Sequence, residues 1–434
     1  MEVVPRSNHR LPVMGRFYFL IRAAAGASTL RRPPEGGVDM EFTQDMFAKH
    51  MRPITGSAIR EIFKLLAKPG MISFAGGNPS NTALEPEVVS DLAREVLQKY
   101  GTSLLQYGAT DGFNPFRESV AEFLRSSSVR CEAKDILPVQ GGTQAFDVLL
   151  KALIDPGDAV LCESPTFLGA IQAMREYNAK LISMPTDDQG VIVEAAEELI
   201  KKHHPKLMYV IPTFQNPTGI TLSLERRRAL AELASRYGVV IAEDDPYRDL
   251  RYAGDALPSI QSFDEEGWVV YMSSFSKYIA PGLRVGAAAV RNPLLLRKMV
   301  IGKQSADTHS PLLNQAIVDA YLRKGLMPGH LERICGDYRE QLNAMLDGFR
   351  FFPEGTVHTV PQGGLFVWAA LPEGMDAMKA FESAVENNVA FVPGTHFYTE
   401  GGHMNTLRLN FSMSDIPTIR TGMERLGRVI AELR

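Results

Sequence analysis

The sequence predicts an α/β fold in which a large domain with a mostly parallel central sheet, flanked by helices, is followed by a smaller α+β domain. Between about residues 84 and 290, helical patterns alternate with short apolar runs, as in repeated βαβ units. After about residue 310, a long helical region gives way to short strands and a last helix. With 434 residues, 45% of them hydrophobic, the chain is long enough to divide its core between two such domains.

Helices of the first region are indicated by their period and by their end signals. From Pro86 onward, apolar residues recur at helical spacing. A connecting helix is expected over residues 224–237, with Ser223 as its N-cap and Gly238 after its last turn.

Short apolar runs supply the expected strands of the large sheet. Because they show no regular polar alternation, they suit strands that are buried on both faces of a parallel sheet. These runs cover residues 159–162, 180–184, 207–211, 239–242, 269–272 and 285–290. In the smaller domain, strands are expected at 364–369, 389–392 and 406–411, and the last helix at 416–433.

Composition and charge argue against several classes of protein. A net charge of −4 provides no basic field for nucleic acid or an anionic membrane, and no apolar run reaches the roughly 18 to 20 residues of a membrane span. The three cysteines lack the spacing of a disulfide framework or a zinc site. The sequence therefore favours small soluble partners, with no nucleic acid, no membrane and no metal, and a cytoplasmic location.

The first candidate for chemistry is Lys277, which ends the segment Ser-Ser-Phe-Ser-Lys after an expected strand and precedes Arg284. A lysine amine forms a Schiff base with an aldehyde such as pyridoxal 5'-phosphate (PLP), and neighbouring hydroxyls with an arginine bind a phosphate. Taken alone, however, the segment is more typical of a solvated surface lysine.

Three carboxylates, Glu243, Asp244 and Asp245, directly follow another expected strand. Side chains at the carboxyl end of a parallel strand point to the crevice where ligands bind. There Asp244 would keep the pyridine nitrogen of PLP protonated, so that the ring accepts electrons from the substrate Cα, and Tyr247 would bond the ring oxygen. The alternative is an acidic loop that caps the next helix.

Two further loops are candidates for the rest of such a site. Asn216, in Asn-Pro-Thr-Gly after the run 207–211, would place its amide on the same ring oxygen, although this sequence is also that of an ordinary turn. Gly141 and Gly142 open a helix whose first N–H groups would bind a phosphate, although such a pair usually marks only a loop.

In order and approximate spacing, these four segments resemble those of PLP-dependent aminotransferases of the aspartate aminotransferase fold, the class I/II aminotransferases. The resemblance runs from about Thr55 to the C-terminus and is closest to the subgroup of kynurenine/2-aminoadipate and aromatic or broad-specificity aminotransferases. It implies the type I PLP-dependent transferase fold and a homodimer with shared active sites.

The resemblance also implies a role for each matching residue. Catalysis falls to Lys277, the Schiff-base lysine and general base, with Asp244 on the pyridine nitrogen and Tyr247 with Asn216 on the ring hydroxyl. The residues that bind the cofactor phosphate in the family are matched by Gly142, Thr143, Ser274 and Arg284. Tyr107 matches the tyrosine that reaches the phosphate in the neighbouring subunit. Phe167 stands where the family usually has a tyrosine that stacks on the ring, and Gly142-Thr143 replaces the more usual Ser-Gln.

Substrate binding is implied for Arg408, which resembles the arginine that holds the α-carboxylate of every substrate in two parallel hydrogen bonds. Asn216 lies beside the same substrate. Gly77 belongs to an N-terminal segment similar to those that line the substrate pocket. Arg60 would contact a distal acidic group, or equally form a salt bridge on a helix surface.

These matches predict an enzyme that transfers the amino group of an L-amino acid to a 2-oxo acid such as 2-oxoglutarate, by a ping-pong mechanism through Lys277. The amino donor would be an aromatic amino acid, 2-aminoadipate or any of a broad range of amino acids. The alternatives are a PLP-dependent β-lyase or decarboxylase on the same fold, or a non-catalytic effector-binding protein. The sequence does not favour the last, because Lys277, Asp244 and Asn216 are all present. A related class of transcription regulator is disfavoured because the N-terminal region lacks the helix-turn-helix pattern.

The expected division of the chain follows from these matches. Residues 1–39 would be a disordered extension, with a transit segment or an upstream start before Met40 as alternatives. Residues 40–83 would line the substrate pocket and join the small domain. Residues 84–310 would form the large PLP-binding domain, and residues 311–434 the small one.

Overall fold

The computed structural model describes residues 42–52, 54 and 70–433. The chain separates into two compact units, one ending at Arg52 and the other beginning at Pro53. In the first unit, a short 3-10 helix, η1 (Gln44–Met46), is followed by Arg52, which pairs with Asp45 at 3.2 Å. The expected extension over residues 1–39 lies outside the described residues.

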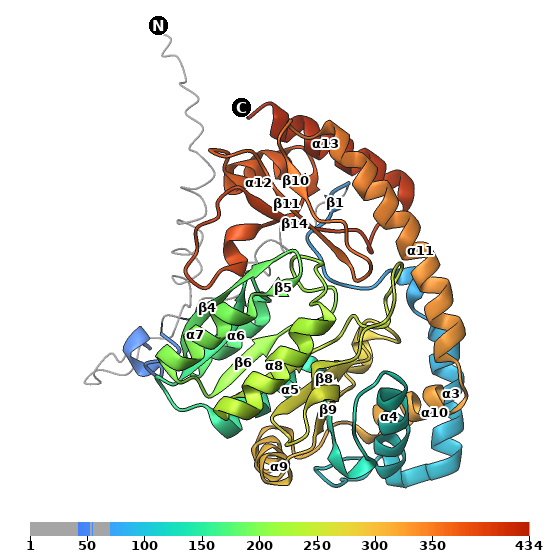
Figure 1. Cartoon of the computed structure of the whole chain (residues 1–434). Coiled ribbons are helices and arrows are strands. Elements are labelled where there is room, and N and C mark those ends of the chain that lie inside the picture. Colours follow the sequence, from blue (N-terminus) through green and yellow to red (C-terminus); the bar gives the residue numbers. More distant parts are fainter. Residues whose placement is uncertain (1–41, 53, 55–69, 434) are drawn as a thin grey trace, which may run out of the picture. The chain divides into compact units, whose positions relative to one another are not determined.

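An eight-stranded sheet forms the centre of the second unit, with the strand order β2-β9-β8-β7-β6-β3-β4-β5 (Figure 1). Its strands are β2 (Ile136–Val139), β3 (Ala159–Ser164), β4 (Lys180–Asp187), β5 (Gly190–Val191), β6 (Leu207–Val210), β7 (Val240–Asp244), β8 (Val269–Ser274) and β9 (Gly286–Val290). The neighbouring strands β4, β3, β6, β7 and β8 pair in parallel. Strand β9 is antiparallel to both of its neighbours, and β5 is antiparallel to β4. The predicted mostly parallel sheet is confirmed.

Helices cover both faces of this sheet because its strands are apolar on both. On one face lie α5 (Gly142–Leu153), α6 (Leu168–Glu176) and α9 (Pro293–Asp307). The other face carries α7 (Val193–His203) and α8 (Leu224–Tyr237). Helix α8 has the predicted bounds, and Gly238 ends it in the left-handed region at φ 65°, although the Ser223 side chain makes no capping bond.

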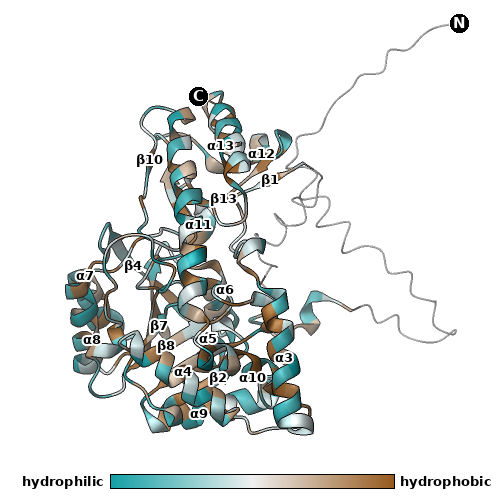
Figure 2. Ribbon diagram, turned by 90° about the vertical axis from the view of Figure 1, so that its right-hand side faces the viewer, coloured by the Kyte–Doolittle hydropathy of each residue, from teal (hydrophilic) through white to brown (hydrophobic). Residues whose placement is uncertain are grey.

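A group of helices packs beside the sheet: α3 (Pro86–Tyr100), α4 (Asn114–Ser126) and α10 (Leu312–Arg323). Figure 2 shows both hydrophilic and hydrophobic residues along α3, as its apolar period predicts. The long helix α11 (Met327–Asp347) follows and packs against the last helix, α13 (Ile416–Ala431).

A smaller sheet follows, with the order β10-β11-β14-β13 and only antiparallel pairs. Its strands are β10 (Val357–His358), β11 (Phe366–Ala370), β13 (Val392–Pro393) and β14 (Thr406–Asn410). Beside it, β1 (Ile72–Ser73) pairs in parallel with β12 (Val389–Ala390), and α12 (Ala377–Glu386) packs on β12 and β13. The single strand expected at 389–392 is therefore two, because its halves bond to different partners.

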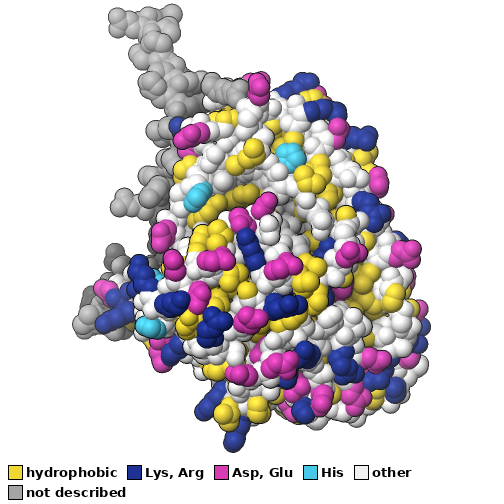
Figure 3. Space-filling model, in the orientation of Figure 1, with side chains coloured by type: hydrophobic (Ala, Val, Ile, Leu, Met, Phe, Trp, Pro, Cys, Tyr) yellow, Lys and Arg dark blue, Asp and Glu magenta, His cyan; other side chains and the backbone are white. Residues whose placement is uncertain are grey.

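Short 3-10 helices connect these elements: η2 (Asn81–Ala83), η3 (Gly101–Leu104), η4 (Ala133–Asp135), η5 (Ile260–Phe263), η6 (Pro281–Leu283), η7 (Gly348–Phe351) and η8 (Gly394–Phe397). Within the described residues, no helix is both long and apolar enough to cross a membrane. Acidic and basic side chains are interspersed over the face drawn in Figure 3. The domain boundaries at 83/84 and 310/311 stay predictions.

Candidate active site

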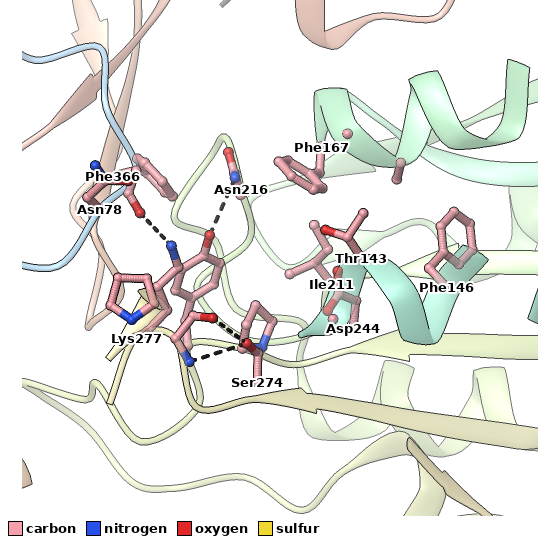
Figure 4. Close-up of a pocket in the computed structure, with 18 of the residues that line it drawn as sticks. Asn78, Thr143, Phe146, Phe167, Ile211, Asn216, Asp244, Ser274, Lys277 and Phe366 are labelled. Atoms are coloured by element: carbon pink, nitrogen blue, oxygen red, sulfur yellow. Dashed lines mark hydrogen bonds between the residues drawn. The ribbon is translucent and has the colours of Figure 1, made fainter. Parts of the chain in front are cut away.

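A cavity of about 350 Å³ lies at the carboxyl end of the parallel strands, where ligands bind in open α/β sheets. Figure 4 shows side chains from several distant segments pointing into it. The predicted site residues that line it are Gly77, Gly142, Thr143, Phe167, Asn216, Asp244, Tyr247, Ser274, Lys277, Arg284 and Arg408. The fold thus brings the four sequence segments together.

One described residue of the predicted site, Tyr107, does not line this cavity. Tyr107 is 82% exposed, and its ring lies 6.0 Å from that of His309 between centroids, at an interplanar angle of 87°. Arg60 lies outside the described residues.

Asp244 occupies the last position of β7 rather than the loop after it. Its carboxylate Oδ2 accepts a hydrogen bond of 2.5 Å from the Tyr209 hydroxyl on β6. The adjacent acids face elsewhere: Glu243 accepts the backbone N–H groups of Ile260 and Gln261, both at 2.8 Å. Strand alternation therefore selects Asp244 as the one acid of the three that lines the cavity.

Lys277 follows β8 by three residues and directs its amine into the cavity. Its Nζ donates to the carbonyl oxygen of Gly77 at 2.6 Å. Burial, and to a smaller extent the charges of Arg408 and Arg284, lower the pKa of the amine to about 8, against the opposing effect of Asp244. The interpretation as a solvated surface lysine is therefore wrong, and the neutral amine is accessible near physiological pH.

An anion cup lies where α5 begins. Gly141 precedes this helix at φ 90°, and a Cβ on it would stand 2.7 Å from Nη2 of Arg284. That guanidinium, itself on a residue with the uncommon φ of 52°, bonds the Gln140 carbonyl at 2.6 Å. The first N–H groups of a helix have no partners within it, so those of Gly142 and Thr143 are free to bind a phosphate beside Arg284.

Two hydroxyls complete this cup. Ser274 ends β8, and its Oγ lies 3.0 Å from that of Ser276. Both serines line the cavity. Two hydroxyls, a guanidinium and a helix start are the donors that hold a phosphate ester.

One wall of the cavity is the ring of Phe167, which precedes α6. The ring lies over Gly169, where a Cβ would come within 2.6 Å of it. Because Gly169 has no side chain, the ring has room to lie there, and its face is suited to stacking on a flat heterocycle.

Arg408 on β14 also lines the cavity and is only 3% exposed. Its Nη1 donates to Oδ1 of Asn216 at 2.9 Å and its Nη2 to the Ala75 carbonyl at 2.8 Å, while Nε has no partner. Asn216 in turn donates to the Tyr247 hydroxyl at 3.4 Å. No carboxylate pairs with this guanidinium in the part of the chain that the structure describes, so a buried cation is available to an incoming anion.

Comparison with known proteins shows the family. A family model described as aminotransferase class I and II matches residues 69–426. Over 393 residues the chain is 39% identical to aromatic-amino-acid aminotransferase 1 of Thermococcus litoralis, covering 89% of this chain and 94% of that protein. This chain belongs to the class I and II aminotransferases.

Two further proteins support this assignment. The 2-aminoadipate transaminase of Thermus thermophilus is 41% identical over 393 residues, covering 90% of this chain and 97% of that protein. The crystal structure of the α-aminoadipate aminotransferase from Thermus thermophilus, complexed with N-(5'-phosphopyridoxyl)-L-leucine, is 39% identical, with a TM-score of 0.83 over 90% of this chain and 98% of that one. The predicted aminotransferase and its fold are confirmed.

The aminotransferase uses PLP, and the cavity offers the groups that this cofactor needs. A phosphate fits the cup at the start of α5, an aromatic ring fits against Phe167, and an aldehyde is within the reach of a lysine amine. Asp244 adds a carboxylate to the wall of the same cavity, and a carboxylate is the group that a cationic ring nitrogen needs as its partner. Among the described residues, no group of three or more His, Cys, Asp or Glu side chains is arranged to hold a metal ion.

Burial, and to a smaller extent the charge of Asp245, raise the pKa of the Asp244 carboxyl to about 6. The hydrogen bond from Tyr209 acts in the opposite direction. At pH 7 the carboxylate is therefore still mostly ionised, as a partner for a cationic ring nitrogen must be.

Among the residues that line the cavity, Tyr209, Phe366 and Ser276 were not predicted as site residues. Tyr209 lies inside an apolar run and has no feature that separates it from the core. Phe366, whose ring centroid lies 4.3 Å from the Arg408 guanidinium, is likewise one of two aromatic residues in an apolar strand. Ser276 carried a signal, since it stands one position before Lys277 in a segment rich in serine.

Proposed function

We propose that this aminotransferase moves the amino group of an aromatic L-amino acid, of 2-aminoadipate, or of a broad range of L-amino acids to a 2-oxo acid such as 2-oxoglutarate. The observation that carries this proposal is the buried Arg408 guanidinium, which has a free Nε and a surround of Phe366 and Phe397 rings at 4.3 and 5.0 Å. A carboxylate would dock on the guanidinium while an apolar side chain packs on the rings. The names of the relatives agree with such donors.

Lys277 is the proposed attachment point of the cofactor and the proposed general base. When bound, PLP supplies an electrophilic carbon and a ring that accepts electrons from the substrate Cα. The amine of Lys277, once released, takes up a proton from that Cα and gives it back on the product side, for which it must be neutral. Burial and the two arginines favour the neutral form, since they lower the pKa to about 8.

The remaining residues would hold and orient the cofactor and the substrate. Asp244 would face the ring nitrogen, while Asn216 and Tyr247 would share the ring oxygen. Gly142, Thr143, Ser274 and Arg284 would hold the phosphate, with Phe167 stacked on the ring. Arg408 would bind the α-carboxylate beside Asn216 and Gly77, and Arg60 stays a candidate for a distal acidic group. Since both substrates need this one pocket, they would take turns in it, which gives ping-pong kinetics.

We also propose a homodimer with shared sites, in the cytoplasm. Support for the dimer comes from Tyr107, a large side chain that is 82% exposed and lies outside the cavity of its own chain. An aromatic residue with a hydroxyl at such a place suits an interface, where its ring packs and its oxygen bonds. In a twofold dimer each Tyr107 would serve the other chain's phosphate.

The donor is tested by steady-state kinetics with 2-oxoglutarate and a panel of L-phenylalanine, L-tyrosine, L-kynurenine, L-2-aminoadipate, L-aspartate and L-alanine. We expect the highest kcat/KM with an aromatic donor or with 2-aminoadipate, and parallel double-reciprocal plots. A preference for aspartate or alanine would overturn the proposed donor class. Release of ammonia or carbon dioxide without formation of glutamate would instead favour the lyase or the decarboxylase.

A further inference from the structure

Tyr209 places a hydroxyl against the carboxylate that the proposed function assigns to the ring nitrogen. It is fully buried, and its Oη donates to Oδ2 of Asp244 at 2.5 Å. In the sheet, Tyr209 on β6 lies opposite Ala242 on β7. Because Asp244 is two residues beyond Ala242, both side chains emerge on the same face, the one that carries α5.

Packing fixes the tyrosine in this position. Its ring lies 4.7 Å from that of Phe146 on α5, at an interplanar angle of 48°. A buried side chain in contact with another ring on a helix has little freedom to turn its hydroxyl away. The bond to Asp244 is therefore a fixed feature of the cavity wall.

The bond also distinguishes the two oxygens of Asp244. Oδ2 is taken by Tyr209, whereas no hydrogen bond reaches Oδ1 within residues 70–433. Oδ1 lies 3.5 Å from the place where a Cβ of Gly142 would stand, on the side of the cavity. The free oxygen is thus the one beside the proposed cofactor position.

We propose that Tyr209 is a positioning residue that directs Oδ1 of Asp244 toward the cofactor's ring nitrogen and keeps the carboxylate ionised. This inference rests on the proposed role of Asp244. A hydrogen bond to a carboxylate stabilises its charge, so the proton shared by the acid and the ring nitrogen stays on the nitrogen. Burial alone would favour the opposite arrangement, with the proton on the acid.

The chain contains a matched control on the other face of the same sheet. Tyr271 on β8 lies opposite Glu243, and its hydroxyl donates to Oδ2 of Asp245 at 3.3 Å. This tyrosine is also buried, with 1% of its surface exposed, and does not line the cavity. Tyr271→Phe therefore removes the same kind of bond without touching the site.

The test is the ¹⁵N NMR shift of PLP labelled at its ring nitrogen and bound to the wild type, to Tyr209→Phe and to Tyr271→Phe. We expect a protonated nitrogen in the wild type and in Tyr271→Phe, and a shift toward the unprotonated value in Tyr209→Phe. Turnover of Tyr209→Phe should fall about tenfold or more in kcat, as expected for a bond to a charged group, with KM nearly unchanged. A wild-type shift and a wild-type kcat in Tyr209→Phe would overturn the inference.

Two further variants separate the possible failures. If Asp244→Asn leaves the nitrogen shift unchanged, the proposed role of Asp244 is wrong; if it changes the shift while Tyr209→Phe does not, only the role of Tyr209 is wrong. Should Tyr209→Phe fail to fold, fluorotyrosine at position 209 keeps the ring and makes the hydroxyl a stronger donor. It should keep the nitrogen protonated to a higher pH, and an unchanged midpoint would count against the inference.

Discussion

At the residue scale, the function depends on groups whose burial changes their chemistry. Lys277 looks like a surface lysine in the sequence and becomes a weakly basic amine in the cavity, with its pKa lowered to about 8 by burial and by two arginines. The order of the motifs pointed to this lysine and to Asp244 because four weak signals coincided, and both residues line the cavity. Tyr209 was not predictable in this way, since its role arises from the pairing of β6 with β7.

Arg408 gives the first prediction at this scale. Arg408→Lys should lower kcat/KM for every amino acid roughly 10- to 100-fold, because an ammonium cannot make two parallel bonds to a carboxylate. Steady-state kinetics with several donors measures this loss. The matched control is Arg251→Lys, which changes an arginine that does not line the cavity and should keep the wild-type rate. A loss confined to one donor would contradict the role as a common carboxylate site.

Glu163 gives a prediction on stability. This buried carboxyl accepts the Ile211 N–H at 2.9 Å, and burial raises its pKa to about 8 from an ordinary 4.5. The folded protein therefore keeps a proton that the unfolded chain releases above about pH 4.5, so stability falls as pH rises from there to about 8.

The variant Glu163→Gln cannot titrate and should lose this part of the pH dependence, which amounts to at most about 1.4 kcal/mol per pH unit. Denaturant unfolding of both proteins at several pH values measures the difference. If wild type and variant show parallel pH profiles, the carboxyl is not protonated in the folded state.

At the element scale, the end of a helix can be predicted from a local sequence signal, whereas the end of a strand depends on its pairing with other strands. Helix α8 matches its prediction because Gly238 is a local signal. The strand at 239–242 was predicted too short, and β7 runs to Asp244 because Glu243 pairs with β6 and β8 and Asp244 pairs with β8. Charged residues seldom indicate a buried strand, so only the ladder itself extends it through the site.

Gly238 also supports a prediction with an internal control. Gly238→Ala should destabilise the protein by about 1 kcal/mol, because φ is 65° there and a Cβ is disfavoured in that region. Gly336→Ala, in the interior of α11 with open space around its Cβ position, should instead stabilise it by about 0.5 to 1 kcal/mol. Thermal unfolding distinguishes the two, and equal effects would contradict this account of the α8 end.

At the scale of the whole molecule, the structure of one chain does not show how copies of the protein assemble. The resemblance to aminotransferases implies a homodimer, and the exposed side chain of Tyr107 supports it. We predict that the protein sediments with the mass of two chains, and that Tyr107→Ala weakens PLP binding about tenfold, as the loss of a hydrogen bond to a charged phosphate would. Leu105→Ala, a neighbouring side chain that is 70% exposed, should have a smaller effect. Unchanged PLP affinity in Tyr107→Ala would contradict a shared phosphate site.

One spectroscopic measurement tests most directly whether Lys277 carries PLP and whether the cofactor takes up the amino group of an amino acid. The visible absorbance of PLP-loaded wild type and of Lys277→Ala is recorded before and after L-2-aminoadipate or an aromatic amino acid is added without any oxo acid. We predict that the wild-type band disappears and the absorbance of the aminated cofactor replaces it, whereas Lys277→Ala shows no such conversion. The proposed role of Lys277 would be contradicted by a wild type that forms no band with added PLP, or by a Lys277→Ala protein that converts at the wild-type rate.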